Sequence, residues 1–232
     1  MNAAEQIDFD ILTFITQSGF SVISLSVVFF IVLTLSSFVK IVTVLGILRA
    51  GLGFQSIPSS FVTGSLAFAL ALFVMFPTLQ VSTAAFDAMI GRGQAKSPEI
   101  LRTQATAAAF EKWKEFLIRH AHPVEKQRFL KIASELDAQT RVSETGAATS
   151  AESIRVLAPA FLVSELKEAF ATGLIVFLPL LVVELVVANV LVAVGLTQLS
   201  PALVSLPFKL LLFVLVDGWG LITGNLLMSY GK

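Results

Sequence analysis

The sequence contains no cysteine, and this absence removes disulfides, thiolate metal ligands and cysteine nucleophiles together. Charge is also scarce: 14% of the 232 residues are charged and 56% are hydrophobic, whereas a soluble domain usually has about 25% charged residues. Sixteen basic residues balance sixteen acidic ones, so no excess positive charge predicts a nucleic-acid partner. A mean hydropathy of +0.86 predicts a membrane protein surrounded by lipid.

Basic residues are missing from the N-terminus as well. The first ten residues, MNAAEQIDFD, carry acidic side chains and no Lys or Arg. A secretory signal peptide begins with a positively charged region. We therefore expect the first apolar helix to be retained in the protein.

The charges that are present are concentrated in the middle of the chain. Residues 81–156 hold eleven of the sixteen basic residues and nine of the sixteen acidic ones. This distribution predicts three parts: an N-terminal tail with a first hydrophobic hairpin (1–80), a polar insert (81–156), and a second hydrophobic hairpin (157–232). All three parts have helical patterns, so the predicted fold class is all-α.

The first hydrophobic part has the pattern of a helical hairpin. Residues 20–40 are long enough to span a bilayer, and the apolar pattern continues to Arg49. GLGFQSIPSS (51–60) contains glycines and Pro58, which are typical of a turn. The uncharged stretch 61–79 supplies the second helix.

The polar insert is predicted to form two amphipathic helices, at 98–120 and 123–141, followed by a flexible small-residue linker at 142–153. Helical spacing places an apolar set on one face of each helix. The first set is Phe110, Trp113, Leu117 and His120, and the second is Phe129, Ile132 and Leu136.

The second hydrophobic part is interrupted by charges and helix breakers. The uncharged run 171–183 is followed by Glu184, and Lys209 and Asp217 come later. The potential kinks or breaks are Gly173, Pro179, Gly195, Pro201 and Pro207. Charges at membrane depth are tolerated when they have protein partners or line a watery cavity. We therefore expect this part to pack inside an assembly.

Lys209 and Asp217 enclose seven apolar residues, too few to cross a bilayer. On one continuous helix they would lie roughly 12 Å apart along the axis and about 80° apart around it. They are therefore predicted to bond to different partners. Downstream, Gly220 and Gly224 have a spacing that allows close helix packing.

No residue pattern in the sequence predicts an enzyme. His120 and His122 form a possible metal pair without a nearby third ligand, so we interpret them as polar surface residues. Ser164, Glu165 and Lys167 lie close together but lack the nucleophile, base and orienting group of a catalytic set. We expect no catalytic residue, metal site or cofactor.

Two long stretches resemble a known family. PAFLVSELKEAFATGL (159–174) and LPFKLLLFVLVDGW (206–219) are similar to the signature stretches of the FliP/SctR family, export-apparatus subunits of bacterial type III secretion. FVKIVTVLGILRAGLG (38–53) and LALFVMFPTL (70–79) resemble the N-terminal hairpin of that family, in the same order.

The resemblance implies an architecture and a set of partners. Family members form kinked, membrane-associated helical hairpins that assemble as a multi-subunit helical cone, with about five copies around a pore. The implied partners are FliQ/SctS-like, FliR/SctT-like and FlhB/SctU-like subunits, membrane lipid, and the unfolded proteins that are exported. The resemblance would place five charged residues at subunit contacts: Glu165, Lys167, Glu184, Lys209 and Asp217.

The pore constriction implied by the resemblance departs from the family pattern. Relatives carry a methionine-rich loop there, and this chain has VGLTQLSPA (194–202) without methionine. The implied constriction residues are Leu196, Thr197, Gln198 and Leu199, with Phe208 as a further candidate. Leucine can seal a pore, but it is branched and less adaptable than methionine.

The residues leave other functions open. Glu184 and Lys209 could belong to an ion path of a membrane transporter, or the chain could be a scaffold that lines no pore. Between export systems, the missing signal sequence favours an injectisome over a flagellum. The positive-inside tendency predicts that the acidic N-terminal tail lies outside the cytoplasm and Arg49 inside, so the polar insert of this inner-membrane protein would be periplasmic.

Overall fold

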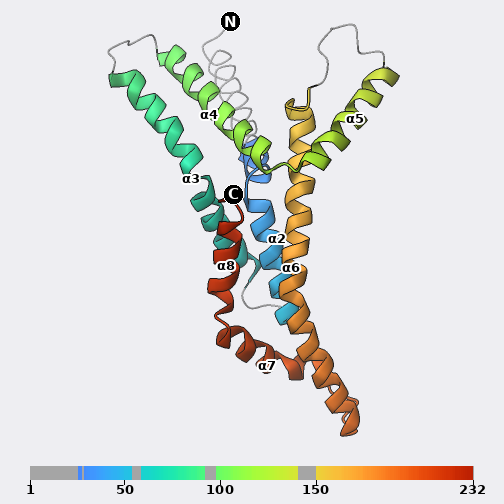
Figure 1. Ribbon diagram of the computed structural model, residues 1–232. Coiled ribbons are helices and arrows are strands. Elements are labelled where there is room, and N and C mark those ends of the chain that lie inside the picture. The colour runs from blue at the N-terminus through green and yellow to red at the C-terminus, as the bar shows by residue number, and fades with distance from the viewer. Residues whose placement is uncertain (1–25, 28, 54–58, 92–97, 141–149, 232) are drawn as a thin grey trace, which may run out of the picture.

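The computed structural model describes residues 26–27, 29–53, 59–91, 98–140 and 150–231. Within these ranges all regular structure is helical, which confirms the predicted fold class (Figure 1). The helices are α2 (Phe38–Leu52), α3 (Ser60–Gly91), α4 (Pro98–His120), α5 (Pro123–Thr140), α6 (Ile154–Ala193), α7 (Pro201–Leu215) and α8 (Gly218–Met228). The predicted N-terminal tail, residues 54–58 of the first turn and residues 142–149 of the linker lie outside the described residues.

Helix α6 is the longest element, with 40 residues. At 1.5 Å per residue it extends over about 60 Å, roughly twice the thickness of a bilayer core. Gly173 and Pro179 lie inside this helix and do not end it, and Pro207 is likewise inside α7. None of the three potential kinks or breaks is therefore a break, and a helix can continue through a proline when packing compensates for the one backbone hydrogen bond that is lost.

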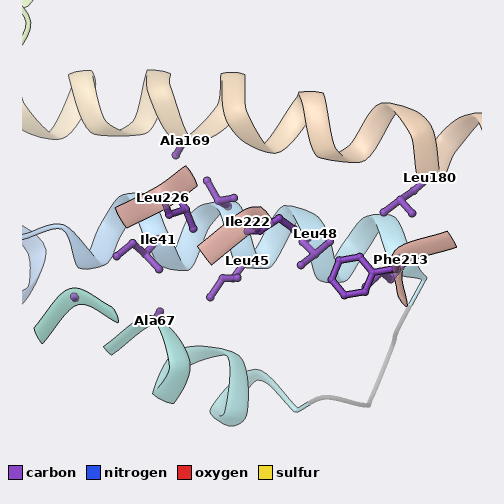
Figure 2. Close-up of a cluster of buried hydrophobic side chains, with 12 residues drawn as sticks. Ile41, Leu45, Leu48, Ala67, Ala169, Leu180, Phe213, Ile222 and Leu226 are labelled. Atoms are coloured by element: carbon purple, nitrogen blue, oxygen red, sulfur yellow. The ribbon is translucent and has the colours of Figure 1, made fainter. Parts of the chain in front are cut away.

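Helix α2 is the centre of the main core, which Figure 2 shows between α2 and the helices around it. Its buried side chains contact residues of α3, α6, α7 and α8. Close approach between α2 and α6 depends on Gly173, where a Cβ atom would lie 2.4 Å from Ile47 Cδ1. The labelled core residues are Ile41, Leu45, Leu48, Ala67, Ala169, Leu180, Phe213, Ile222 and Leu226.

A second core joins the polar insert to α6. Phe116 and Leu117 of α4 pack with Phe161 of α6, and the indole N–H of Trp113 donates to the Leu35 carbonyl at 3.0 Å. On α5, Phe129 packs against this core. The other two members of the predicted α5 face, Ile132 and Leu136, are exposed. That face is therefore only partly covered within one chain.

The structure has the helices of a membrane protein. In the part of the chain that the structure describes, two helical stretches are long and apolar enough to cross a membrane, Ser60–Thr78 and Ile154–Ala193. Helices α7 and α8 together would form a third span, broken by a 60° bend. Figure 1 shows the α3–α4 hairpin and the α5 helix diverging at one end, while α6 and α7 extend to the other. Many large apolar side chains on α3, α6 and α7 are exposed, as lipid or partner chains would require.

Candidate functional site

The turn between α6 and α7 forms a tip at one end of the molecule (Figure 1). Gly195 has φ +82, in the left-handed region that favours glycine. Its amide donates to the Val192 carbonyl at 3.1 Å, and the Leu196 amide donates to the Leu191 carbonyl at 2.9 Å. These two bonds form a Schellman motif, which ends α6 and fixes the direction of the following residues.

Leu196 and Leu199 leave much of their apolar surface at this tip uncovered, and each is 48% exposed. Thr197 and Gln198 are exposed between them. Pro201 then starts α7 at its first turn, a position where proline fits a helix well. The predicted breaks at Gly195 and Pro201 are therefore confirmed, and they bound a short, ordered apolar turn.

An ion pair between a buried lysine and a partly exposed glutamate holds α7 to α6. Lys209 is only 2% exposed, and its Nζ lies 2.5 Å from Glu184 Oε2. Glu184 is 25 residues earlier in the chain, on α6. The pair satisfies both charges within one chain and ties the two helices of the hairpin together. A further contact of either residue with another subunit stays a prediction.

Asp217 forms the bend between α7 and α8. Its φ of 49 is left-handed, and its carboxylate accepts from the Gly220 amide at 3.4 Å as the N-cap of α8. Lys209 lies inside α7 and Asp217 in the bend after it, so the two are not on one continuous helix, but they do bond to different partners as predicted. Asp tolerates the left-handed conformation better than most residues, which allows the helix to break here.

Phe208 lines a groove rather than the tip. It is 55% exposed and faces a groove of 470 Å³ between α6 and α7. The remaining residues of this groove are apolar: Val182, Val183, Val186, Val187, Val190, Leu191 and Val204. The structure therefore does not bring Phe208 together with the four tip residues.

Gly220 and Gly224 do not form a packing face within this chain. A Cβ at Gly224 would meet nothing within 4 Å, and one at Gly220 would meet only the capping Asp217 side chain. Their role at a contact with another chain stays a prediction. Inside the chain, an added Cβ would be crowded at Gly51 by Phe177, at Gly173 by Ile47 and at Gly218 by Phe213.

A second polar cluster lies on the N-terminal half of α6. Lys40 of α2 is buried, and its Nζ lies 2.5 Å from Glu168 Oε2. Glu165 is buried too and accepts from the Tyr230 hydroxyl. Lys40 and Tyr230 were not singled out in the sequence. Lys40 is nevertheless a lone lysine in an apolar helix, which is the same sequence signal that singled out Lys209.

Lys167 pairs with Glu125 of α5, which Arg128 also contacts at 3.2 Å. The hydrogen bond from Lys167 lowers the pKa of the Glu125 carboxyl below its ordinary value, although burial acts in the opposite direction. This pair fastens the polar insert to α6. Lys167 thus has a partner within its own chain, and an inter-subunit role for it remains a prediction.

The residues considered for chemistry have structural partners. Ser164 Oγ donates to the Ala160 carbonyl at 2.7 Å and accepts from the His122 amide at 2.9 Å. His120 is half-buried and His122 is exposed. Among the described residues, no group of three or more His, Asp or Glu side chains could hold a metal ion.

The sequence profile of the FliP family matches residues 21–226, nearly the whole chain. The chain belongs to the FliP family. Both signature stretches fall within this match: the α6 stretch supplies Glu165, Lys167 and Glu168, and the α7 stretch supplies Lys209 and Asp217. The two signature stretches thus supply one member of three ion pairs, namely Lys167, Glu168 and Lys209, together with the Asp217 bend.

Similar proteins of the FliP family include virulence-related and flagellar ones. The chain is 37% identical over 209 residues to "Pathogenicity-related ORF2" of Xanthomonas campestris pv. glycines, covering 90% of this chain and 94% of that protein. It is 40% identical over 202 residues to "Flagellar biosynthetic protein FliP" of Caulobacter vibrioides, covering 87% and 71%. It is 36% identical over 200 residues to "Yop proteins translocation protein R" of Yersinia pestis, covering 84% and 87%.

Membership of the FliP family defines the coarse function. The chain is a membrane-embedded subunit of a type III secretion export apparatus, a multi-subunit machine found in both flagellar and injectisome lineages.

Proposed function

We propose that this FliP-family chain is a pore-forming core subunit of the export gate, through which unfolded proteins cross the bacterial inner membrane. The observation that carries the proposal is the α6–α7 tip. Two half-exposed leucines lie on a turn fixed by a Schellman motif, at the end of a hairpin held by the ion pair of Lys209 and Glu184. A ring of such tips would place apolar side chains around a narrow path.

The exposed apolar surface supports an assembly. Helix α6 is about twice as long as a bilayer core is thick, so lipid alone would not cover it. Among its strongly exposed residues are Ile175 and Val192, and Val194 directly after the helix is exposed as well. We propose that further copies of the chain cover much of this surface, together with FliQ/SctS-like and FliR/SctT-like subunits. A FlhB/SctU-like subunit would join the same complex.

We place the polar insert, with α4 and α5, on the periplasmic side. The ion pair between Lys167 and Glu125 holds that insert against the N-terminal half of α6, away from the tip. Among export systems we favour an injectisome, supported by the likeness to the pathogenicity-related protein of Xanthomonas. The flagellar alternative is favoured by the comparably high identity to the FliP protein of Caulobacter.

An ion-coupled transporter is the less supported alternative. It would use Glu184 and Lys209 as stations of an ion path. These two side chains are bonded to each other at 2.5 Å, so each already neutralises the other. A pair of this kind holds two helices together more readily than it passes an ion.

Substituting both tip leucines tests the gate. Apolar rings close a channel to ions by dewetting. Leu196→Gly with Leu199→Gly should therefore make the reconstituted complex leak small ions, measured as conductance across a planar bilayer. Methionine at both positions should preserve the seal, because side-chain volume is nearly conserved.

The control is Leu215→Gly, which removes an exposed leucine of α7 away from the tip. Conductance should stay at the parental value in this variant. Glycine tip variants that assemble and are no leakier than the parent would remove the tip from the gate.

A further inference from the structure

The segment that follows α8 is anchored in a cluster of rings and charges on the polar insert. Tyr230 stacks on Phe116 of α4, with ring centroids 6.1 Å apart and an interplanar angle of 19°. Lys40 Nζ lies 4.7 Å from the centre of the Tyr230 ring, a cation–π contact. The Tyr230 hydroxyl donates to the buried Glu165 carboxylate. One residue near the end of the chain thus joins α2, α4 and α6.

His120 lies between two of these rings. Its imidazole centroid is 4.3 Å from that of Phe116 and 5.2 Å from that of Tyr230. Nδ1 is 2.9 Å from the Phe116 carbonyl oxygen, to which it can donate as N–H. Nε2 is buried and has no hydrogen-bond partner among the described residues. This arrangement suits the neutral ring, in which Nε2 carries a lone pair.

Protonation would change the contact between His120 and Tyr230. A second N–H would appear at Nε2, which makes no hydrogen bond in the described structure, and the Tyr230 carbonyl, which favours the protonated ring, would have to shift to accept it. An unsatisfied buried donor costs about 1 to 3 kcal/mol. The new N–H must therefore stay unpaired or pull a group of the Tyr230 segment toward it, and either result disturbs the ring stack.

Charged side chains of both signs surround His120. Lys40 faces it from α2, and Arg119 is its neighbour on α4. Glu165 and Glu168 of α6 lie beyond the Tyr230 ring, bound to Tyr230 and Lys40. From α5, Lys126 Nζ donates to the Ile118 carbonyl at the same helix end. The α3 residues packed against this core are apolar: Val74 and Met75.

The electrostatic balance favours neutral His120. Burial lowers the pKa of His120 below its ordinary value, and the Arg119 and Lys40 cations act in the same direction. The carbonyls of Phe116 and Tyr230 oppose this shift but do not cancel it. Because the folded-state pKa is depressed, the stabilising contact is complete above the ordinary histidine pKa and is lost as the pH falls through the folded-state value.

We propose that His120 and Tyr230 form a pH-sensitive latch that holds the end of α8 against the polar insert and opens when His120 is protonated. The latch is a property of the single chain and does not depend on the proposed pore. Opening would free the end of α8, which is joined through the Asp217 bend to α7 and hence to the tip. Acidification on the side of the polar insert would thereby remove one of the contacts that hold α8, and through it α7, in place.

The chain offers a clean probe for this latch. It has no cysteine, so Gly231→Cys introduces a single labelling site, at an exposed residue beside Tyr230. A nitroxide at this position, in the full chain in detergent micelles, reports local mobility by electron paramagnetic resonance. We expect an immobilised spectrum at pH 8 and a mobile one at pH 5, with the midpoint below the ordinary histidine value of about 6.5.

Matched variants assign the response to one group. His120→Phe keeps an aromatic ring in the stack and cannot titrate, so its spectrum should stay immobilised throughout this pH range. His122→Gln removes the other of the two histidines, which is exposed, and should respond like the parent. Glu165→Gln tests the carboxylate that Tyr230 contacts.

Two results would overturn the latch. They are a parent spectrum that does not change with pH and a pH response that persists in His120→Phe; if Glu165→Gln abolishes that persisting response, the titrating group is the carboxylate. Should His120→Phe fail to fold, an NMR titration of the two histidines in the parent decides instead. The midpoint of His120 must then coincide with the mobility midpoint, and separate midpoints would reject the latch.

Discussion

Glu184→Ala is expected to destabilise the chain strongly, because it leaves the ammonium group of Lys209 buried without a partner. Breaking a buried pair by removing one member costs about 3 to 5 kcal/mol. Glu184 is itself 38% exposed, so water can compensate in part, and we expect a loss near the lower end, about 3 kcal/mol. The measurement is the free energy of unfolding in denaturant, for the full chain in detergent micelles.

Two variants make this measurement specific. Glu115→Ala breaks the pair of Lys112 and Glu115 on α4, whose side chains are 44% and 52% exposed. Such a surface pair contributes at most about 1 kcal/mol. Combining Glu184→Leu with Lys209→Met should recover most of the stability, because no charge is then left unpaired. Equal losses in Glu184→Ala and Glu115→Ala would show that the buried pair does not hold the hairpin.

Gly173→Val should separate α2 from α6. The Cβ of any side chain at this position would lie 2.4 Å from Ile47 Cδ1 and 3.1 Å from Ile47 Cβ, so the helices must move or Ile47 must change rotamer. Overpacking of this kind costs typically about 1 to 3 kcal/mol. Because α6 packs against α2 along the main core, we expect the upper end of that range. The thermal unfolding midpoint of the chain in micelles should fall accordingly.

Gly46→Val is the matched control. Gly46 lies on α2 next to Ile47, but a Cβ there would meet nothing within 4 Å. Valine and glycine differ little in helix propensity, so its effect should stay within a few tenths of a kcal/mol. Adding Ile47→Ala to Gly173→Val should restore part of the lost stability. If the two valine variants unfold alike, the contact between Gly173 and Ile47 does not set the helix spacing.

Local signals in the sequence predicted much of the helix pattern. The helices expected at 98–120 and 123–141 are found at Pro98–His120 and Pro123–Thr140. Proline at each start and the loss of helical pattern at each end are local features, so they could be recognised without tertiary structure. The break between Gly195 and Pro201 was predicted for the same reason.

Prolines inside the apolar helices were harder to interpret. Pro179 has the same local preference as Pro201, but it lies in the interior of α6 while Pro201 starts α7. Which of the two ends a helix depends on the packing around it, and hydropathy does not record that packing. The bend at Asp217 depends on a left-handed conformation that Asp adopts only in a suitable context.

The partners of the buried charges could be identified only from the three-dimensional fold. The sequence indicated that Glu184 and Lys209 needed protein partners, but their contact joins residues 25 apart. Lys40 and Glu168 are 128 residues apart, and Tyr230 and Glu165 are 65 apart. No spacing rule links residues at such separations. Glu165 and Glu168 do have the i, i+3 spacing of one helix face. This spacing could have indicated that both carboxylates face the same neighbouring helices.

The central claim is that exported proteins pass along the α6–α7 tip. A photo-reactive amino acid at Leu199 in the assembled complex tests this directly, when an export substrate fused to a stably folded domain is stalled in the gate. The matched position is Leu215, which is 74% exposed on α7 away from the tip. The account predicts substrate crosslinks from Leu199 and none from Leu215. Crosslinks from Leu215 with none from Leu199 would contradict it.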